Sequence, residues 1–465
     1  MAAGGSTEIV MRVGHFVVVL TGLLHAWLLA ATGLAGAGLD GSPRRDVLLQ
    51  DGWRFIKEDV AGAEASSFDD SGWEKVRVPH TWNAVDAQSK ADYYRGPGWY
   101  RKTITLGADE VGPRSGKRAY LRFEAVAVVA DVFVNGQQLG HHRGAFGAFC
   151  VEASGALKPG ANVIAVRADN TKFPDIAPIS GDFAIFGGVY RDAHLLILDE
   201  KSIDPLDDAS PGVYVSQEEV TPERARVLVT TKLRNRNNDN WDAMVRCIVR
   251  DAAGNEVATH ETTTRVNGTG IKGEWNADVV QNILIERPRL WNGHPSTGSA
   301  PPHLYSVTVE TWDRRPAGGR LTDRVVQPLG LRSIRIDPDK GLFLNDERYR
   351  LHGPNRHQDR KDKGWAISKE DHDQDFDIIL EMGASGVRLA HYPHAEYAYS
   401  LCDKNGLLVW AEIPLVDRVA HTAEFAANAK QQLREMIKQH FNHPSIIVWG
   451  ISNERGMGRD TNRGA

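Results

Sequence analysis

The chain has 465 residues, 55 basic and 60 acidic side chains, and a formal net charge of −5. This length predicts about three domains, and a hydrophobic content of 42% excludes disorder for most of the chain. The slightly acidic balance excludes a strongly basic nucleic-acid binder, so we expect no nucleic-acid partner. Cys150, Cys247 and Cys402 are widely spaced in apolar surroundings. Their spacing excludes a disulfide framework and a Cys/His metal motif, and their surroundings predict buried thiols.

Residues 1–45 are predicted to be a signal-like or anchor-like segment followed by a linker. Arg12 precedes an apolar run over residues 16–38, which ends in Ala35-Gly36-Ala37, a pattern of small residues that resembles a signal-peptide cleavage site. The run also approaches the roughly 20 residues that span a bilayer, so an uncleaved membrane anchor is the alternative. We therefore expect a secreted or exported protein; a wrongly assigned start of translation would remove this argument.

Residues 46–205 are predicted to form an all-β domain. Alternating runs at 119–123 and 130–134 are followed by Asn135-Gly136 and a third run at 137–140. An Asn-Gly pair between alternating runs is a strong hairpin signal, and further runs cover 162–168 and 193–198. Strands of this number and spacing fit a jelly roll.

Residues 206–336 are predicted to form a second β domain. Alternating seven-residue runs occupy 227–233, 244–250 and 304–310, and Ala253-Gly254-Asn255 forms a turn between two strands. A segment of this size with strands at this spacing fits an immunoglobulin-like sandwich.

Residues 337–465 change to an α/β pattern. Short apolar strands at 350–352, 386–390, 407–413 and 446–451 alternate with helices at 368–382, 395–405 and 422–441, the first of them capped by Ser368. Four such units correspond to the first half of a (β/α)8 TIM barrel. A half barrel leaves two open strand edges, so we expect the chain to be truncated; an independent four-stranded α/β sheet is the alternative.

Polar side chains follow each of these four strands. In a TIM barrel the active site lies at the carboxyl ends of the strands. Those positions hold His357 after the first strand, Arg388 and His391 at the second, Glu412 at the third, and Asn453-Glu454 after the fourth. A structural role readily explains one such residue, but it does not explain polar residues at the ends of all four strands.

These residues also carry a resemblance to a known family. The chain resembles the retaining glycoside hydrolases that include β-galactosidases, β-glucuronidases and β-mannosidases. The matching segments are LHGPNRHQD (351–359), VRLAHYP (387–393), WAEIP (410–414) and WGISNE (449–454) in the barrel, and GWYR (98–101) and GGVYRD (187–192) in the jelly roll.

The resemblance implies roles for individual residues. Retaining glycosidases use two carboxyl groups about 5 to 5.5 Å apart, one as acid/base and one as nucleophile. Glu454, beside Trp449, corresponds to the acid/base. The resemblance implies that Asn453 donates a hydrogen bond to the sugar 2-hydroxyl and that His357 and His391 donate to other sugar hydroxyls. It also implies that Asp182 reaches into the sugar pocket from the jelly roll and that Arg388 braces the nucleophile.

The resemblance leaves the nucleophile and the substrate open. The family's nucleophile is a Glu in the second half of the barrel, so we expect it, and the partner of Arg388, beyond residue 465; Glu412 is not expected to replace it. We therefore expect this polypeptide alone to be inactive or nearly so. The sequence His357-Gln358-Asp359 favours terminal β-galactosides, hydrolysed with retention. A β-glucuronidase, a β-mannosidase and a non-catalytic sugar-binding fragment are the alternatives.

The resemblance also bears on cofactors and partners. Some relatives bind magnesium through a Glu-x-His after the third strand, but residues 415–418 (LVDR) lack both ligands. We therefore expect no metal and no cofactor. The expected partner is a β-galactoside or oligosaccharide, and self-association, which is common among relatives, stays open.

Overall fold

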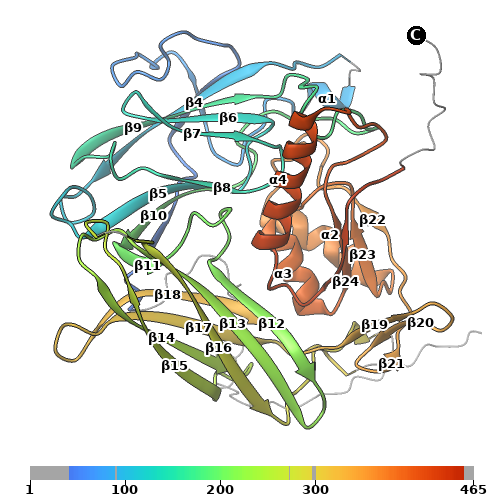
Figure 1. The fold of residues 1–465 in the computed structure, drawn as a ribbon. Helices are drawn as coiled ribbons and strands as arrows, with labels where there is room; N and C mark the ends of the chain where they lie inside the picture. The colour runs from blue at the N-terminus through green and yellow to red at the C-terminus, as the bar shows by residue number, and fades with distance from the viewer. Residues whose placement is uncertain (1–40, 90–91, 272, 296–299, 455–465) are drawn as a thin grey trace, which may run out of the picture. The chain divides into compact units, whose positions relative to one another are not determined.

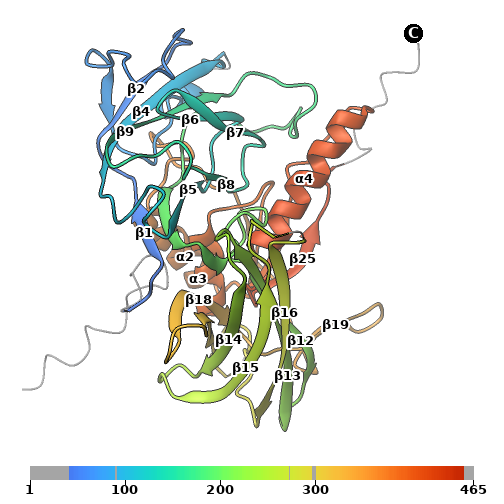
Figure 2. The ribbon, with the colours of Figure 1, turned by 60° about the vertical axis from the view of Figure 1, so that its left-hand side comes forward.

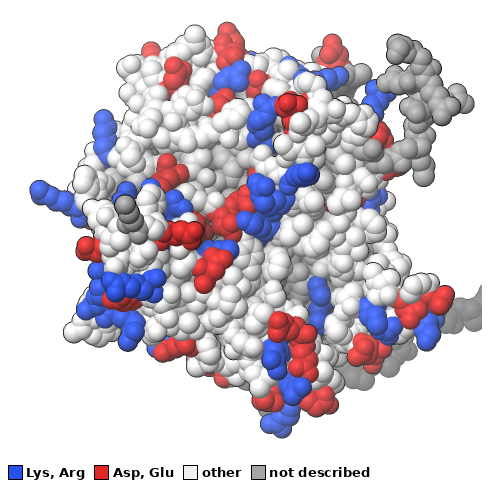
Figure 3. All heavy atoms as spheres, in the orientation of Figure 1, with Lys and Arg blue, Asp and Glu red and all other residues white. Residues whose placement is uncertain are grey.

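The computed structural model describes residues 41–89, 92–271, 273–295 and 300–454. The predicted signal-like segment, apart from its last residues, lies outside these ranges. Within the described part, no helix has the length and apolar character needed to cross a membrane. Acidic and basic side chains are interspersed over the face in Figure 3, in line with the near balance of the composition.

The first domain is built from two antiparallel sheets (Figure 1). Their facing sides bury one core that includes Trp53, Phe123, Val132 and Leu195. Asn135 and Gly136 have φ angles of 53° and 87°, the left-handed values that a two-residue hairpin turn requires, as predicted. The first sheet has the order β1 (Arg45–Leu48), β10 (Ala193–Asp199), β5 (Lys117–Phe123), β8 (Phe149–Glu152), and the second has the order β3 (Glu74–Val76), β2 (Trp53–Ile56), β4 (Pro97–Leu106), β9 (Gly160–Asp169), β6 (Val129–Val134), β7 (Gln137–Arg143). A short helix, α1 (Asp86–Ser89), lies between β3 and β4 in the chain.

The second domain is a sandwich of two four-stranded antiparallel sheets (Figure 2). Trp241, Val227 and Val309 belong to its core. One sheet contains β11 (Lys201–Ile203), β13 (Arg224–Asn235) and β12 (Val213–Val220), with β16 (Asn276–Glu286) also paired to β13. The other has the order β15 (Glu256–Val266), β14 (Trp241–Arg250), β17 (Tyr305–Asp313), β18 (Arg320–Leu329). A small sheet of β19 (Ile334–Asp337), β20 (Gly341–Leu344) and β21 (Glu347–Arg348) precedes the parallel strands of the last domain.

The third domain contains four parallel strands in chain order with helices between them. They are β22 (Asn355–Arg356), β23 (Gly386–Leu389), β24 (Leu408–Glu412) and β25 (Ile446–Gly450), with α2 (Lys369–Glu381), α3 (Glu396–Asn405) and α4 (Ala423–Gln439). Ser368 and Asp371 form the capping box of α2. The structure thus has the predicted fold class: a jelly roll, an immunoglobulin-like sandwich and the first half of a TIM barrel.

Two local predictions need correction. The first barrel strand was expected at 350–352 but is β22, at Asn355–Arg356. Pro354 lacks an amide hydrogen, and Gly353 lies so close to β23 that an added Cβ would be 1.7 Å from the carbonyl oxygen of Gly386, so regular pairing starts after them. Cys247 and Cys402 are buried as predicted, whereas Cys150 is only half-buried.

Helix α4 contacts the jelly roll directly. Ala177 donates its amide hydrogen to Asn428 Oδ1 (3.2 Å), and Gln432 Nε2 donates to the carbonyl of Ala177 (3.0 Å). Asn428 Nδ2 donates to the carbonyl of Arg143 (2.8 Å). These buried amide contacts hold the start of the jelly-roll segment 176–186 against the barrel, where that segment continues towards the strand ends.

Candidate active site

The carboxyl ends of β23, β24 and β25 meet in one hydrogen-bonded network. Arg388 Nη2 donates to Glu412 Oε1 (2.8 Å) and to Asn453 Oδ1 (2.7 Å), and Arg388 Nε lies 3.2 Å from Glu412 Oε2. His391 Nδ1 lies 2.9 Å from Glu412 Oε1, and Trp410 Nε1 donates to Oε2 (3.1 Å). Three neighbouring strands thus present one arginine, one carboxylate, one imidazole and one amide at a single edge.

Glu412 is the centre of this network, a role that the sequence analysis missed. We expected the carboxylate partner of Arg388 beyond residue 465, but among the described residues Glu412 already pairs with it. In the parallel register, Arg388 lies opposite Trp410, so Glu412 is only two residues away on the neighbouring strand. Both oxygens of Glu412 accept hydrogen bonds and the residue is 1% exposed. It is therefore placed to position Arg388 and His391 rather than to attack a sugar.

The two histidines of the predicted site lie together. Their ring centroids are 5.1 Å apart. His391 Nδ1 also lies 3.2 Å from Arg388 Nη2, so the imidazole contacts both members of the Arg388–Glu412 pair. The hydroxyl of Tyr392 accepts from the amide of Gln358 (3.3 Å) and lies 3.2 Å from His357 Nδ1, to which it can donate.

The protonation of His357 follows from its surroundings. Burial lowers the pKa of His357, and the neighbouring His391 lowers it further. His357 is therefore neutral at pH 7. In the tautomer in which Nδ1 accepts from the Tyr392 hydroxyl, the hydrogen lies on Nε2, and His357 can donate it to a ligand hydroxyl.

Asn453 and Glu454 follow the fourth strand, as the sequence predicted. The backbone of Asn453 is fixed by hydrogen bonds with Leu415 and Asp417, and its Oδ1 accepts from Arg388. This fixes the orientation of the amide, so that Nδ2 is a donor with no acceptor among the described residues. Glu454 is exposed and has a φ of 52°, a left-handed conformation that is uncommon outside glycine and is concentrated at functional sites.

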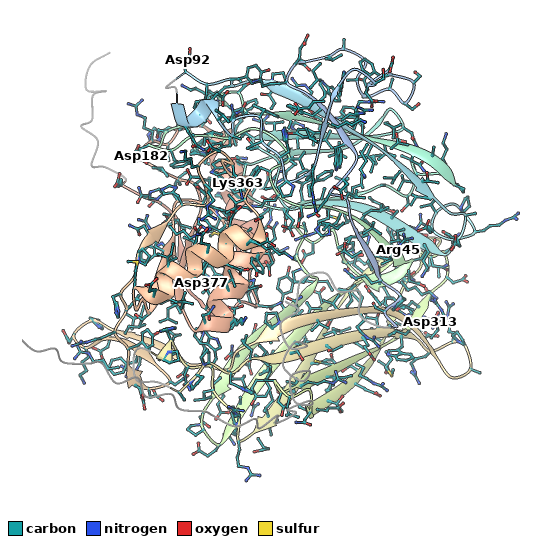
Figure 4. The ribbon with its side chains drawn as sticks, turned by 180° about the vertical axis from the view of Figure 1, so that it is seen from behind. Arg45, Asp92, Asp182, Asp313, Lys363 and Asp377 are labelled. Carbon is teal, nitrogen blue, oxygen red and sulfur yellow. The ribbon has the colours of Figure 1, made fainter. Side chains whose placement is uncertain are left out.

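The jelly roll contributes the segment that contains Asp182. Ser180 Oγ donates to the carbonyl of Val416 (2.9 Å) and accepts from the amide of Arg418 (3.1 Å), so this segment is attached to the loop after β24. The ring of Phe183 lies 5.5 Å from that of His357 and 6.0 Å from that of His391. Asp182, labelled in Figure 4, is exposed. Its charge opposes the lowering of the pKa of His357. The sequence singled out Asp182 but missed Phe183, its neighbour.

One other cluster has metal-ligand chemistry. Ligand atoms of Glu396, His440 and His443 lie within 4.8 Å of one another. His443 is hydrogen-bonded on both sides, through Nε2 to Glu396 (2.7 Å) and through Nδ1 to Asp403 (2.6 Å). Burial alone would lower the pKa of His443, but the charges of Glu396 and Asp403 raise it to about 10. His443 thus joins Glu396, whose side chain is 44% exposed, and the buried Asp403 in one charged network.

Comparisons with known proteins agree with this architecture. Models of glycosyl hydrolases family 2 match consecutive parts of the chain: the sugar binding domain at residues 49–199, a family 2 domain at 212–332 and the TIM barrel domain at 334–463. A β-glucuronidase of Bacteroides fragilis is 42% identical over 423 residues, which are 88% of this chain and 56% of that protein. A β-galactosidase of Thermoanaerobacter pseudethanolicus is 31% identical over 414 residues, 88% of this chain and 51% of that protein.

A solved structure gives the same result. The structure of Bacteroides uniformis β-glucuronidase 2, covalently bound to cyclophellitol-6-carboxylate aziridine, superposes with a TM-score of 0.81 at 35% sequence identity. The match covers 89% of this chain and 47% of that one. This chain spans about half the length of the curated relatives that it matches. The three domains, their order and these relatives show that the chain belongs to glycosyl hydrolase family 2, the family of the β-galactosidases and β-glucuronidases.

Proposed function

We propose that the protein hydrolyses terminal β-glycosides with retention, and that Glu454 is its general acid/base. The proposal rests mainly on one observation. Asn453, directly before Glu454, is fixed by Arg388 with its amide donor unused, in a network at the carboxyl ends of three parallel strands. This arrangement offers a carboxyl group and oriented hydrogen-bond donors at the edge where barrel enzymes bind substrate.

The substrate that we propose is a β-glucuronide. The sequence argument for a β-galactoside depended on Gln358, but that side chain is 1% exposed and its Oε1 accepts from the amide of Ala395 (2.6 Å). Gln358 thus holds the loop after β23 and has no oxygen directed at a sugar. The B. fragilis relative, at 42% identity, is named a β-glucuronidase. A β-galactoside is the second candidate, because the T. pseudethanolicus relative, at 31% identity, is named a β-galactosidase.

The mechanism needs two proton transfers. Glu454 first gives its proton to the departing glycosidic oxygen while a carboxylate nucleophile, which we expect beyond residue 465, forms a bond to the anomeric carbon. Glu454 then takes a proton from the water that releases the sugar. The adduct of the B. uniformis relative with an aziridine supports such a covalent step. The Nε2–H of His357 and the Nδ2–H of Asn453 would donate to sugar hydroxyls.

A leaving-group experiment tests this proposal on the full-length product of the gene. The substrates are the 2,4-dinitrophenyl and methyl β-D-glucuronides, with the matching galactosides as the second arm. Glu454→Gln should lower kcat/KM for the methyl glycoside by about 10²–10⁴-fold. It should lower the dinitrophenyl value much less, because that leaving group needs no proton.

The matched control is Glu424→Gln, at an exposed position in the first turn of α4. It should leave both rates unchanged. Equal losses for both leaving groups in Glu454→Gln, or release of the α-anomer in an NMR time course, would refute the proposed role. Faster hydrolysis of the galactosides would assign the substrate to the second candidate.

A further inference from the structure

A cavity of about 610 Å³ lies in the jelly roll beside the candidate active site. It is lined by segments on both sides of β9 in the chain, residues 92–95 before it and residues 171–185 after it. Figure 4 labels Asp92 and Asp182, which lie on the same side of this domain. The predicted catalytic and sugar-binding residues do not line this cavity, and the role proposed for Glu454 does not require it.

The charged residues of the cavity lining are two cations, Arg95 and Lys172, and one exposed carboxylate, Asp92. Arg95 and Lys172 form no ion pair with any residue in the described ranges. Arg95 is held in place by main-chain oxygens: its Nε donates to the carbonyl of Asn170 (2.7 Å), and Nη2 lies 3.5 Å from that of Thr171. Burial lowers the pKa of Arg95, and nearby tyrosine and aspartate side chains oppose this. A half-buried guanidinium that is positioned only by neutral groups favours an anionic ligand.

The rest of the lining suits a sugar or another ring. Tyr93, Phe173 and Phe183 supply aromatic surface. Tyr93 is fixed because its hydroxyl accepts from the amide of Ile185 (2.7 Å). Aromatic faces with a few polar groups are the usual lining of a carbohydrate-binding pocket.

The cavity and the strand-end site share a wall. Phe183 lines the cavity, and its ring also lies against those of His357 and His391. Ser180 lines the cavity and is bonded to the loop after β24. A ligand whose terminal sugar lies at His357 and His391 would therefore extend past Phe183 into the cavity with its leaving group.

We propose that this cavity binds the leaving-group side of the substrate, and that Arg95 and Lys172 select a leaving group that carries a carboxylate or a sulfate. This inference rests on the proposed glycosidase function and specifies its substrate as an acidic glycoside. The ring of the leaving group stacks on the aromatic lining, and its anionic group pairs with the two cations.

The test compares leaving groups of similar size that differ in charge. The probes are the 4-carboxyphenyl β-D-glucuronide, its neutral methyl ester on the phenyl carboxyl group, and the 4-sulfophenyl β-D-glucuronide. For the full-length protein, kcat/KM for an acidic probe should exceed that for the ester about tenfold, the size expected for a charge-assisted contact. The preference should shrink as salt is raised from 0.05 to about 0.5 M. The carboxylate and sulfonate probes show which anion is preferred.

Variants assign the preference to the two cations. Lys172→Gln, at an exposed position, should lower the ratio of acidic to ester kcat/KM by about threefold or more, and Arg95→Lys should keep most of it because the charge stays. Lys158→Gln, an exposed lysine outside the cavity lining, is the matched control and should keep the full ratio.

The outcomes separate this inference from the proposed function. Hydrolysis of the ester with no preference for the acidic probes would refute the inference and leave the glycosidase assignment standing. If neither these probes nor the matching β-D-galactosides are hydrolysed, the glycosidase assignment fails. The cavity is then judged by calorimetric titration of this chain with 4-carboxyphenyl β-D-glucuronide and its ester. Equal affinities, or a preference that Lys172→Gln does not reduce, would refute it.

Discussion

Replacing Glu412 by Gln should loosen the carboxyl ends of β23 and β24. Glu412 accepts from Arg388 through both oxygens (2.8 and 3.0 Å) and from Trp410 (3.1 Å), and its Oε1 lies 2.9 Å from His391 Nδ1. Gln keeps one acceptor oxygen but replaces the other by an NH2 group, which would face the donors of Arg388 and Trp410. The exchange therefore removes the charge and sets donor against donor.

The expected magnitude follows from these contacts. A hydrogen bond to a charged group contributes about 1.5–3 kcal/mol, and a buried donor left without an acceptor costs about 1–3 kcal/mol. Glu412 is 1% exposed, but the side chain of Arg388 is 26% exposed, so solvent screens part of the loss. We therefore expect a loss of about 3 kcal/mol, well below the sum of the separate contacts.

Hydrogen exchange measures this loss where it occurs. In the Glu412→Gln variant, the amides of β24 (Leu408–Glu412) should exchange roughly a hundredfold faster, since about 1.4 kcal/mol corresponds to a factor of ten. Glu424→Gln, on the exposed side of α4, is the matched control and should change these rates by less than about twofold. A change under about threefold in Glu412→Gln would refute the view that Glu412 holds the network together.

Three further predictions concern other contacts. The raised pKa of His443 stabilises the fold fully below pH 6.5, and this stabilisation is lost as the pH rises towards about 10. The free energy of unfolding should therefore fall over this range by up to about 1.4 kcal/mol per pH unit. In urea titrations, the free energy of unfolding of His443→Gln should depend less on pH. Because burial lowers the pKa of His357, its ring NMR signals should titrate with a midpoint below 6.5, and a midpoint above that would contradict the neutral donor. Gly353→Ala should cost a few kcal/mol in thermal unfolding because its Cβ would collide with the Gly386 carbonyl, whereas Gly155→Ala, with no neighbour within 4 Å, should be nearly neutral.

Features set by adjacent residues were predictable from the sequence. The capping box of Ser368 and Asp371 and the hairpin at Asn135-Gly136 depend on a few consecutive side chains, and both appear as expected. The first barrel strand was misplaced because its apolar run, 350–352, precedes Gly353 and Pro354. The start of regular pairing with β23 depends on the close approach of Gly353 to the carbonyl group of Gly386. The composition of the segment does not reveal this approach.

The candidate site was predictable as a set of residues but not as a set of contacts. The rule that barrel sites lie at strand ends, together with the family resemblance, selected Arg388, His391 and Asn453, which the structure brings together. The pairing of Arg388 with Glu412 depends on the register of β23 and β24, which only the folded sheet fixes. The approach of Phe183 depends on how the jelly roll meets the barrel, and no local sequence signal encodes that.

The jelly roll and the half barrel are joined by a shared core, which bears on whether the first could act as a separate sugar-binding module. Phe146 of the jelly roll stacks on Tyr392 of the barrel with ring centroids 4.3 Å apart, and Trp365 packs against both rings. These side chains belong to one buried cluster with Phe186 and Tyr190. Domains that move or bind independently usually meet through smaller and more polar surfaces. Tyr392, part of this core, also orients His357, so the packing between the domains and the geometry of the site depend on the same side chain.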